Sequence, residues 1–257
     1  MYSSGAPNKI YTLAFDYRGF GSSTGTPSEA GCINDAISVV EWALNVANIS
    51  PDRIVLLGHS LGTAISTATV HHFLTRADPL EFSGLILCAG FTNATNAFRS
   101  YAIGGVVPVL VPLKYMPPLA EWFSQHVTDT WKTDERLVEI VQKSSKLRLA
   151  LLHANNDLTM PWQQTEELFK RIVEGAVDQR LGDEILQNIV TRSDLGELGW
   201  EETWKAGERT VTKLILNEGG MSTTVVDMYI SVLTLDRTRS NDEVSTCVSQ
   251  GPPIFRP

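Results

Sequence analysis

The chain has 257 residues, of which 43% are hydrophobic, and this length fits one soluble domain with a sizeable core. Its 21 basic and 29 acidic residues give a net charge of −8 without a basic cluster, which argues against nucleic acid as a partner. The three cysteines, Cys32, Cys88 and Cys247, form no C-x-x-C pair, so we expect neither a disulfide framework nor a zinc site, and a reducing compartment is favoured.

The first part of the chain predicts two strand–loop–helix units. Residues 10–17 are rich in β-branched and aromatic side chains and predict a strand, which a turn-rich loop follows. Residues 29–47 repeat apolar side chains at helical spacing and predict a helix. Residues 53–58 then predict a strand that is buried on both faces, and residues 61–74 predict a helix of mostly small side chains.

The same alternation continues later in the chain. Residues 83–90, 146–154 and 209–220 predict three more buried strands, and residues 162–175 predict a helix. Strands that alternate with helices pair in parallel through right-handed crossovers. The sequence therefore predicts an α/β fold with a mostly parallel sheet flanked by helices.

An insertion and a tail depart from this alternation. Residues 91–145 contain an apolar run at 102–113 that glycines and prolines interrupt. We expect a cap over the carboxyl ends of the strands whose apolar run lines a cavity, and an ordinary surface loop is the alternative. Residues 238–257 lose periodicity and predict a disordered tail. The expected organisation is one domain over residues 1–237 with a cap insertion at about 91–145.

The sequence contains no signal for secretion or for a membrane span. The N-terminal stretch "MYSSGAPNKI" lacks a basic segment followed by an apolar one. The apolar run at 102–113 is shorter than the roughly 20 residues that a span requires. These features predict a cytoplasmic or membrane-associated protein.

A serine lies between a predicted buried strand and a predicted helix. Residues 58–62 read "GHSLG", and this setting exposes the hydroxyl of Ser60 while the backbone N–H of Leu61 points at a developing oxyanion. The alternative is that Ser60 only caps the helix that follows.

A carboxylate follows a later predicted strand. Asp157, in "LLHANNDLTMP", could orient a base for Ser60. The alternative is a turn-forming aspartate that caps the helix beginning near Pro161.

Four stretches together resemble the α/β-hydrolase superfamily: "FDYRGFGSSTGTPSE", "LLGHSLGT", "LILCAGFTN" and "LLHANNDLTMP". The resemblance covers about residues 10–235 and is closest to the monoacylglycerol and lysophospholipid lipase branch. It implies Ser60 as nucleophile, Asp157 as acid and Leu61 as one oxyanion-hole amide, with His59 beside the nucleophile and not the base. It also implies a lipid or ester substrate, neither a metal nor an organic cofactor, and it allows peripheral association with a membrane.

The sequence departs from the family at the catalytic base. The family places its base histidine in the loop after the last strand, where this chain reads "NEGGMSTT" with Met221 at the expected position. A thioether cannot accept the proton of a serine hydroxyl, and no histidine follows Asp157. The other histidines are poor substitutes. His153 resembles a structural tether of the acid loop, His126 lies in the predicted cap, and His71 and His72 lie about three turns beyond the elbow.

A second departure concerns the start of the sheet. The family has three strands before the one at residues 10–17, and only nine residues precede Ile10. The family's third strand lies between the strands that match residues 10–17 and 53–57, and the loop after it supplies the other oxyanion amide. We therefore expect an incomplete domain, in which these two strands pair directly in a new order or leave unpaired backbone groups that destabilise the sheet.

The sequence as a whole predicts a serine hydrolase of carboxylic esters, such as monoacylglycerols or lysophospholipid-like lipids, whose catalysis is impaired in this chain. One alternative is a catalytically dead α/β-hydrolase-fold protein that binds a ligand or a partner. Another is an active enzyme of different specificity, such as a peptidase or a thioesterase.

Overall fold

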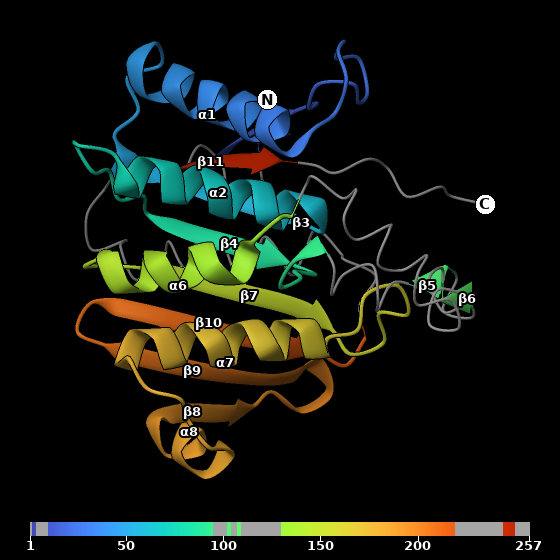
Figure 1. Cartoon of the computed structure of the whole chain (residues 1–257), viewed down its shortest axis with the longest axis vertical. Coiled ribbons are helices and arrows are strands. Elements are labelled where there is room, and N and C mark those ends of the chain that lie inside the picture. The colour runs from blue at the N-terminus through green and yellow to red at the C-terminus, as the bar shows by residue number, and fades with distance from the viewer. Residues whose placement is uncertain are drawn as a thin grey trace, which may run out of the picture.

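A mixed β-sheet with helices along one face forms the framework of the protein (Figure 1). The computed structural model describes residues 11–94 and 130–218 in full, and the backbone alone of residues 2–3, 10, 102–103, 107–108 and 244–249. The strands are β1 (Tyr2–Ser3), β2 (Ile10–Phe15), β3 (Ile54–His59), β4 (Gly84–Cys88), β5 (Ala102–Ile103), β6 (Val107–Pro108), β7 (Arg148–Ala154), β8 (Val190–Asp194), β9 (Gly199–Ala206), β10 (Arg209–Leu216) and β11 (Val244–Ser249). The helices are α1 (Glu29–Asn45), η1 (Pro51–Arg53), α2 (Leu61–Thr75), α6 (Thr133–Lys143), α7 (Gln163–Val177), α8 (Asp183–Ile189) and η2 (Gly196–Leu198).

The centre of the sheet is parallel, as the sequence predicts. The described strands follow the order β1-β2-β11-β3-β4-β7-β10-β9-β8, and the six from β2 to β10 run parallel to their neighbours. Strands β3, β4 and β7 consist almost wholly of buried apolar residues, as expected for strands whose side chains are buried on both faces of the sheet. The five strands predicted from the sequence correspond to β2, β3, β4, β7 and β10.

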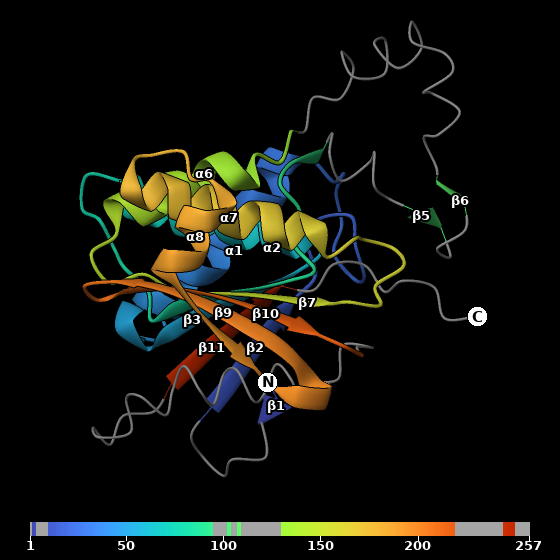
Figure 2. The same ribbon diagram turned by 90° about the horizontal axis from the view of Figure 1, so that it is seen from below.

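The main helices α1, α2, α6 and α7 lie along the same face of the sheet (Figure 2). Helix α2 packs against α1 on one side and α6 on the other, and α6 packs against α7. Alternate residues of the strands point at these helices and form the larger core with them, for example Leu56, Leu85 and Leu149. The intervening residues, such as Val55, Ile86 and Ala150, form a second buried cluster on the opposite face.

Strand β11 lies between β2 and β3, where the sequence predicts either direct pairing or a gap. It pairs in parallel with both neighbours, so that Thr246 lies opposite Thr12 on one side and Val55 on the other. The backbone groups that a gap would leave unpaired are thus hydrogen-bonded, which removes a cost of about 1 to 3 kcal/mol per group. Strand β11 at Val244–Ser249 falls within the tail predicted as disordered, and the other residues of that tail lie outside the described part of the chain.

Part of the predicted cap belongs to the framework. Residues 133–143 form α6, whose buried face of Leu137, Ile140 and Val141 packs into the main core. Of residues 95–129 the structure describes only the two-residue pairing of β5 with β6. The apolar cavity predicted from residues 102–113 lies outside the described residues, and the cap remains a prediction.

A helix and two strands that the sequence did not predict extend the sheet beyond β10. Helix α8 leads into β8, and β8 and β9 form antiparallel pairs that end at β10. The helix-facing side of this extension is partly charged. Lys213 of β10 is fully buried and is paired with Glu166 of α7 and, at 2.7 Å, with Glu202 of β9. Glu202 interrupts the apolar pattern from which β9 would be recognised as a buried strand.

Candidate functional site

Ser60 occupies a strained turn between β3 and α2. Its backbone angles are φ 51° and ψ −119°, a region that a residue with a side chain rarely adopts and that costs on the order of 1–3 kcal/mol. Neighbouring groups hold this conformation. The Ser60 amide donates to the carbonyl of Cys88 at 2.9 Å, and the Ser60 carbonyl accepts from the amide and the hydroxyl of Thr63 at 2.9 and 2.6 Å. The turn is therefore built into the framework.

Glycine at position 58 makes this turn sterically feasible. A Cβ atom at Gly58 would lie 2.2 Å from the carbonyl oxygen of Gly62, in the first turn of α2. The strand and the helix thus approach each other more closely than any other residue at position 58 would allow. Ser60 stands at the N-cap position of α2, but its side chain makes no capping hydrogen bond. The capping alternative therefore does not account for this serine.

The backbone amide of Leu61 is the first of helix α2. The first amides of a helix have no partner within it, and they lie at its positive end, where a developing negative charge is stabilised. This position suits the predicted oxyanion-hole role, which remains a prediction. No residue of this chain is predicted to supply the second oxyanion-hole amide of the family.

Asp157 lies in the loop after β7, the second strand beyond β3 in the sheet. Its Oδ1 accepts the amides of Thr159 and Met160 at 2.8 and 3.0 Å, so the carboxylate does shape a turn. It does not cap helix α7, which begins at Gln163 after Trp162. Burial acts to raise the pKa of Asp157, but the nearby N–H of His153, 3.6 Å from Oδ2, and the two amides outweigh it and hold the pKa below its usual value.

His153 is engaged on both ring nitrogens and cannot reach Ser60 as a base without breaking these bonds. The ring is fully buried, with Nε2 2.9 Å from the carbonyl of Met160 and Nδ1 2.7 Å from the hydroxyl of Thr165. A carbonyl only accepts, so Nε2 carries a proton, and the same nitrogen lies 3.6 Å from Oδ2 of Asp157. His153 thus ties the acid loop to helix α7, in keeping with the structural role that the family resemblance implies.

His59 lies near Asp157 and His153. Burial lowers its pKa, the charge of Asp157 raises it and His153 lowers it, with a net shift downward. Its imidazole is therefore neutral at pH 7. Along β3 the side chains alternate, which places His59 on the face of Val55 and Leu57, opposite α2.

The remaining candidates for the catalytic base lie either at the far end of α2 or outside the described residues. His71 bonds to Glu139 of α6 at 2.9 Å, and the ring of His72 meets the ring of Phe73 edge to face. Both lie near the end of α2 remote from Ser60, as predicted. His126 and Met221 lie outside the described residues, so the base position remains a prediction.

The sequence did not reveal how the insertion is anchored beside the elbow. The chain leaves and re-enters the framework at one point, because the amide of Ala94 donates to the carbonyl of Thr130 at 3.0 Å. Trp131 follows with φ 46°, and its amide donates to Oε2 of Glu29 at 2.9 Å. Trp131 packs in an apolar cluster with Phe91, Met160 and residues of α2 next to Ser60.

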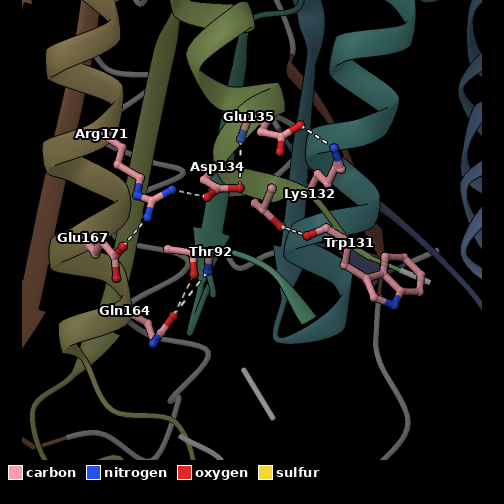
Figure 3. Close-up of polar contacts among 9 residues, drawn as sticks. Thr92, Trp131, Lys132, Asp134, Glu135, Gln164, Glu167 and Arg171 are labelled. Atoms are coloured by element: carbon pink, nitrogen blue, oxygen red, sulfur yellow. Dashed lines mark hydrogen bonds and ion pairs between the residues drawn. The ribbon is translucent and has the colours of Figure 1, made fainter. Parts of the chain in front are cut away.

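Polar side chains continue this anchor toward α7 (Figure 3). The amides of Thr133 and Asp134 both donate to the carbonyl of Thr92 at 3.1 Å, and the Thr92 hydroxyl lies 3.2 Å from Oε1 of Gln164. Asp134 also pairs with Arg171. These residues are scattered over the sequence without a common motif, so no sequence signal marked them as neighbours.

The fold and the elbow together define an α/β hydrolase. The chain belongs to the alpha/beta hydrolase family, whose model matches residues 3–211. The α/β hydrolase from Vibrio vulnificus superimposes with a TM-score of 0.53 at 19% identity, over 87% of this chain and 60% of that chain, which shows the fold alone.

Two curated relatives are more similar in sequence to this chain than the Vibrio vulnificus hydrolase. Lysophosphatidylserine lipase ABHD12 of Bos taurus is 32% identical over 189 residues, which are 72% of this chain and 43% of that protein. Uncharacterized protein YfhR of Salmonella typhi is 30% identical over 165 residues, which are 62% of this chain and 49% of that protein. The chain thus spans less than half the length of these curated relatives. Within the described residues, no helix has the length and apolar character to cross a bilayer.

Proposed function

We propose that this protein is a serine hydrolase of carboxylic esters, with monoacylglycerols or lysophospholipid-like lipids as substrates, and that it works slowly in the present chain. The observation that carries the proposal is the strained Ser60, which the framework holds in a disfavoured conformation with its side chain unused for capping. Such strain is typical of functional positions, because the folded structure must offset its cost. The similarity to lysophosphatidylserine lipases supports the substrate class.

In the proposed reaction, Oγ of Ser60 attacks the ester carbonyl carbon and loses its proton. The tetrahedral oxyanion lies at the amide of Leu61, and its collapse expels the alcohol with a proton and leaves an acyl-serine. Water then attacks the acyl-serine, releases the carboxylic acid and restores the hydroxyl. Each attack requires a base. Met221 cannot supply one, and within the described part of the chain both nitrogens of His153 are engaged, so we expect water to take the proton, which is slow.

An activity probe tests the proposal directly. A fluorophosphonate that forms a stable adduct with activated serines should label the wild-type protein and not Ser60→Ala. Ser38→Ala is a matched control, since Ser38 lies on the exposed side of α1 and bonds only to the carbonyl of Asn34. Labelling should be unchanged in this variant. Labelling of Ser60→Ala at the wild-type rate would contradict the assignment of Ser60.

A non-catalytic protein that binds a ligand or a partner is the second candidate. One observation favours it, namely that both nitrogens of His153 are bound within the framework and leave no spare acceptor for Ser60. The same probe separates the two candidates. A folded wild-type protein that resists the probe, and that does not hydrolyse short p-nitrophenyl esters above the rate of Ser60→Ala, would favour the binding protein.

A further inference from the structure

Two leucines at one edge of the sheet are unusually exposed. Leu158 is 70% exposed and Leu198 is 59% exposed, and with Val46 they are the three most exposed of the large apolar residues that the structure describes. Single exposed leucines are common on protein surfaces. What distinguishes this pair is its position relative to the candidate site.

Both leucines lie at the carboxyl edge of the parallel strands, where Ser60 and Asp157 also lie. Leu158 follows Asp157 in the loop after β7, and Leu198 ends η2 just before β9. Strand β9 is antiparallel to β10, so its first residue, Gly199, lies opposite the last residue of β10. Two strand spacings separate β7 from β9, which is about 10 Å.

Backbone hydrogen bonds connect the two loops through the end of β10. The amide of Asn155 donates to the carbonyl of Leu216 at 2.6 Å, and the amide of Asn217 donates to the carbonyl of Leu198 at 3.1 Å. Both leucines are therefore presented on loops that are fixed to the sheet. Such loops lose little conformational freedom on binding, which favours association.

Two tryptophans, one before α7 and one in β9, contact each other next to the loops that carry the leucines. The rings of Trp162 and Trp200 meet edge to face with centroids 5.5 Å apart, and the guanidinium of Arg192 lies 5.4 Å from the Trp200 ring. Tryptophan combines a large apolar ring with one N–H donor and is typical of the boundary between water and lipid. We call Leu158, Trp162, Leu198 and Trp200 the edge surface.

The charges near the edge surface indicate which lipid it fits. Asp194 and Glu197 are exposed close to Leu198, with Arg192 as the nearby cation, and the whole chain carries a charge of −8. Anionic headgroups would be repelled by this balance. A zwitterionic headgroup has no net charge and leaves the apolar contacts to determine binding.

We propose that the edge surface docks on a zwitterionic phospholipid surface and turns the candidate site toward the lipid. Leu158 and Leu198 enter the headgroup region, and the tryptophan pair lies at its boundary. The inference rests on the proposed function, since it gives the route by which a lipid ester would reach Ser60. Binding itself requires no turnover and can be measured separately.

Flotation of the full chain with phosphatidylcholine vesicles tests the proposal. Leu158→Ser and Leu198→Ser should each lower the partition of the protein into vesicles about three- to tenfold, because each removes apolar area from the contact. The two losses should multiply in the double variant, since the leucines are on separate loops. Val46→Ser is the matched control. Val46 is 65% exposed but follows α1 at the opposite edge, and its change should leave partition unaffected.

Three results would overturn the docking proposal. They are no partition of the wild-type protein at about 1 mM lipid, a loss in Val46→Ser equal to that in the leucine variants, or a change in self-association in place of vesicle binding. Phosphatidylserine in the vesicles should not strengthen binding. A protein that binds vesicles but resists the fluorophosphonate would keep this inference and refute the proposed hydrolase, and the reverse pattern would do the opposite.

Discussion

Replacement of Gly58 by alanine tests whether the close approach of β3 and α2 creates the serine turn. The new Cβ would lie 2.2 Å from the carbonyl oxygen of Gly62 and 2.7 Å from the amide of Thr63. Both are backbone atoms, so no side chain can rotate away, and the start of α2 must shift by roughly 1 Å. Overpacking in a well-packed core costs about 1–3 kcal/mol, and we expect the upper end of this range because the backbone itself must move.

The loss can be measured by urea unfolding followed through tryptophan fluorescence. A decrease of about 3 kcal/mol is large against the roughly 5–15 kcal/mol that stabilises a typical domain. Gly182→Ala is the matched control, because Gly182 has φ −69° and no atom lies within 4 Å of its added Cβ. We expect a change of at most about 0.5 kcal/mol there. Fluorophosphonate labelling should fall in Gly58→Ala and persist in the control. A loss below about 1 kcal/mol with normal labelling would refute the steric argument.

Three further predictions concern the site and the sheet. If the loop after β10 keeps the family geometry, Met221→His should raise ester hydrolysis, and Asp157→Ala should abolish the gain; no gain in a folded Met221→His protein would mean that position 221 is not the base position. The pKa of Asp157 is lowered in the folded state, so its contribution to stability is present above its unfolded value near pH 4 and is lost as the pH falls through the folded value. The stability difference between wild type and Asp157→Asn should therefore shrink on acidification below about pH 4, and a difference that is constant with pH would contradict the assignment. The amides of β11 should exchange with deuterium much more slowly than those of an unstructured peptide of the same sequence, because both strand neighbours are paired; rapid exchange would remove β11 from the sheet.

The sequence alone determined the order and the type of the main elements and the position of the elbow. These features depend on residues close together in the chain. Buried strands such as β3 and β7 appear as continuous apolar runs, because their side chains are buried on both faces of the sheet. Gly58 beside Ser60 marks a sharp turn, since only a residue without Cβ fits there. The position of Asp157 just after a strand followed from the same local pattern.

Only the tertiary structure decided how distant segments meet. The place of β11 depends on which strand edges are open, and its own sequence does not encode them. Strand β9 hides its buried face from sequence patterns, because Glu202 pairs with the buried Lys213 of β10 inside the fold. Likewise, His153 could be excluded as an available base only when the partners of both ring nitrogens were known, since Thr165 lies twelve residues further along the chain.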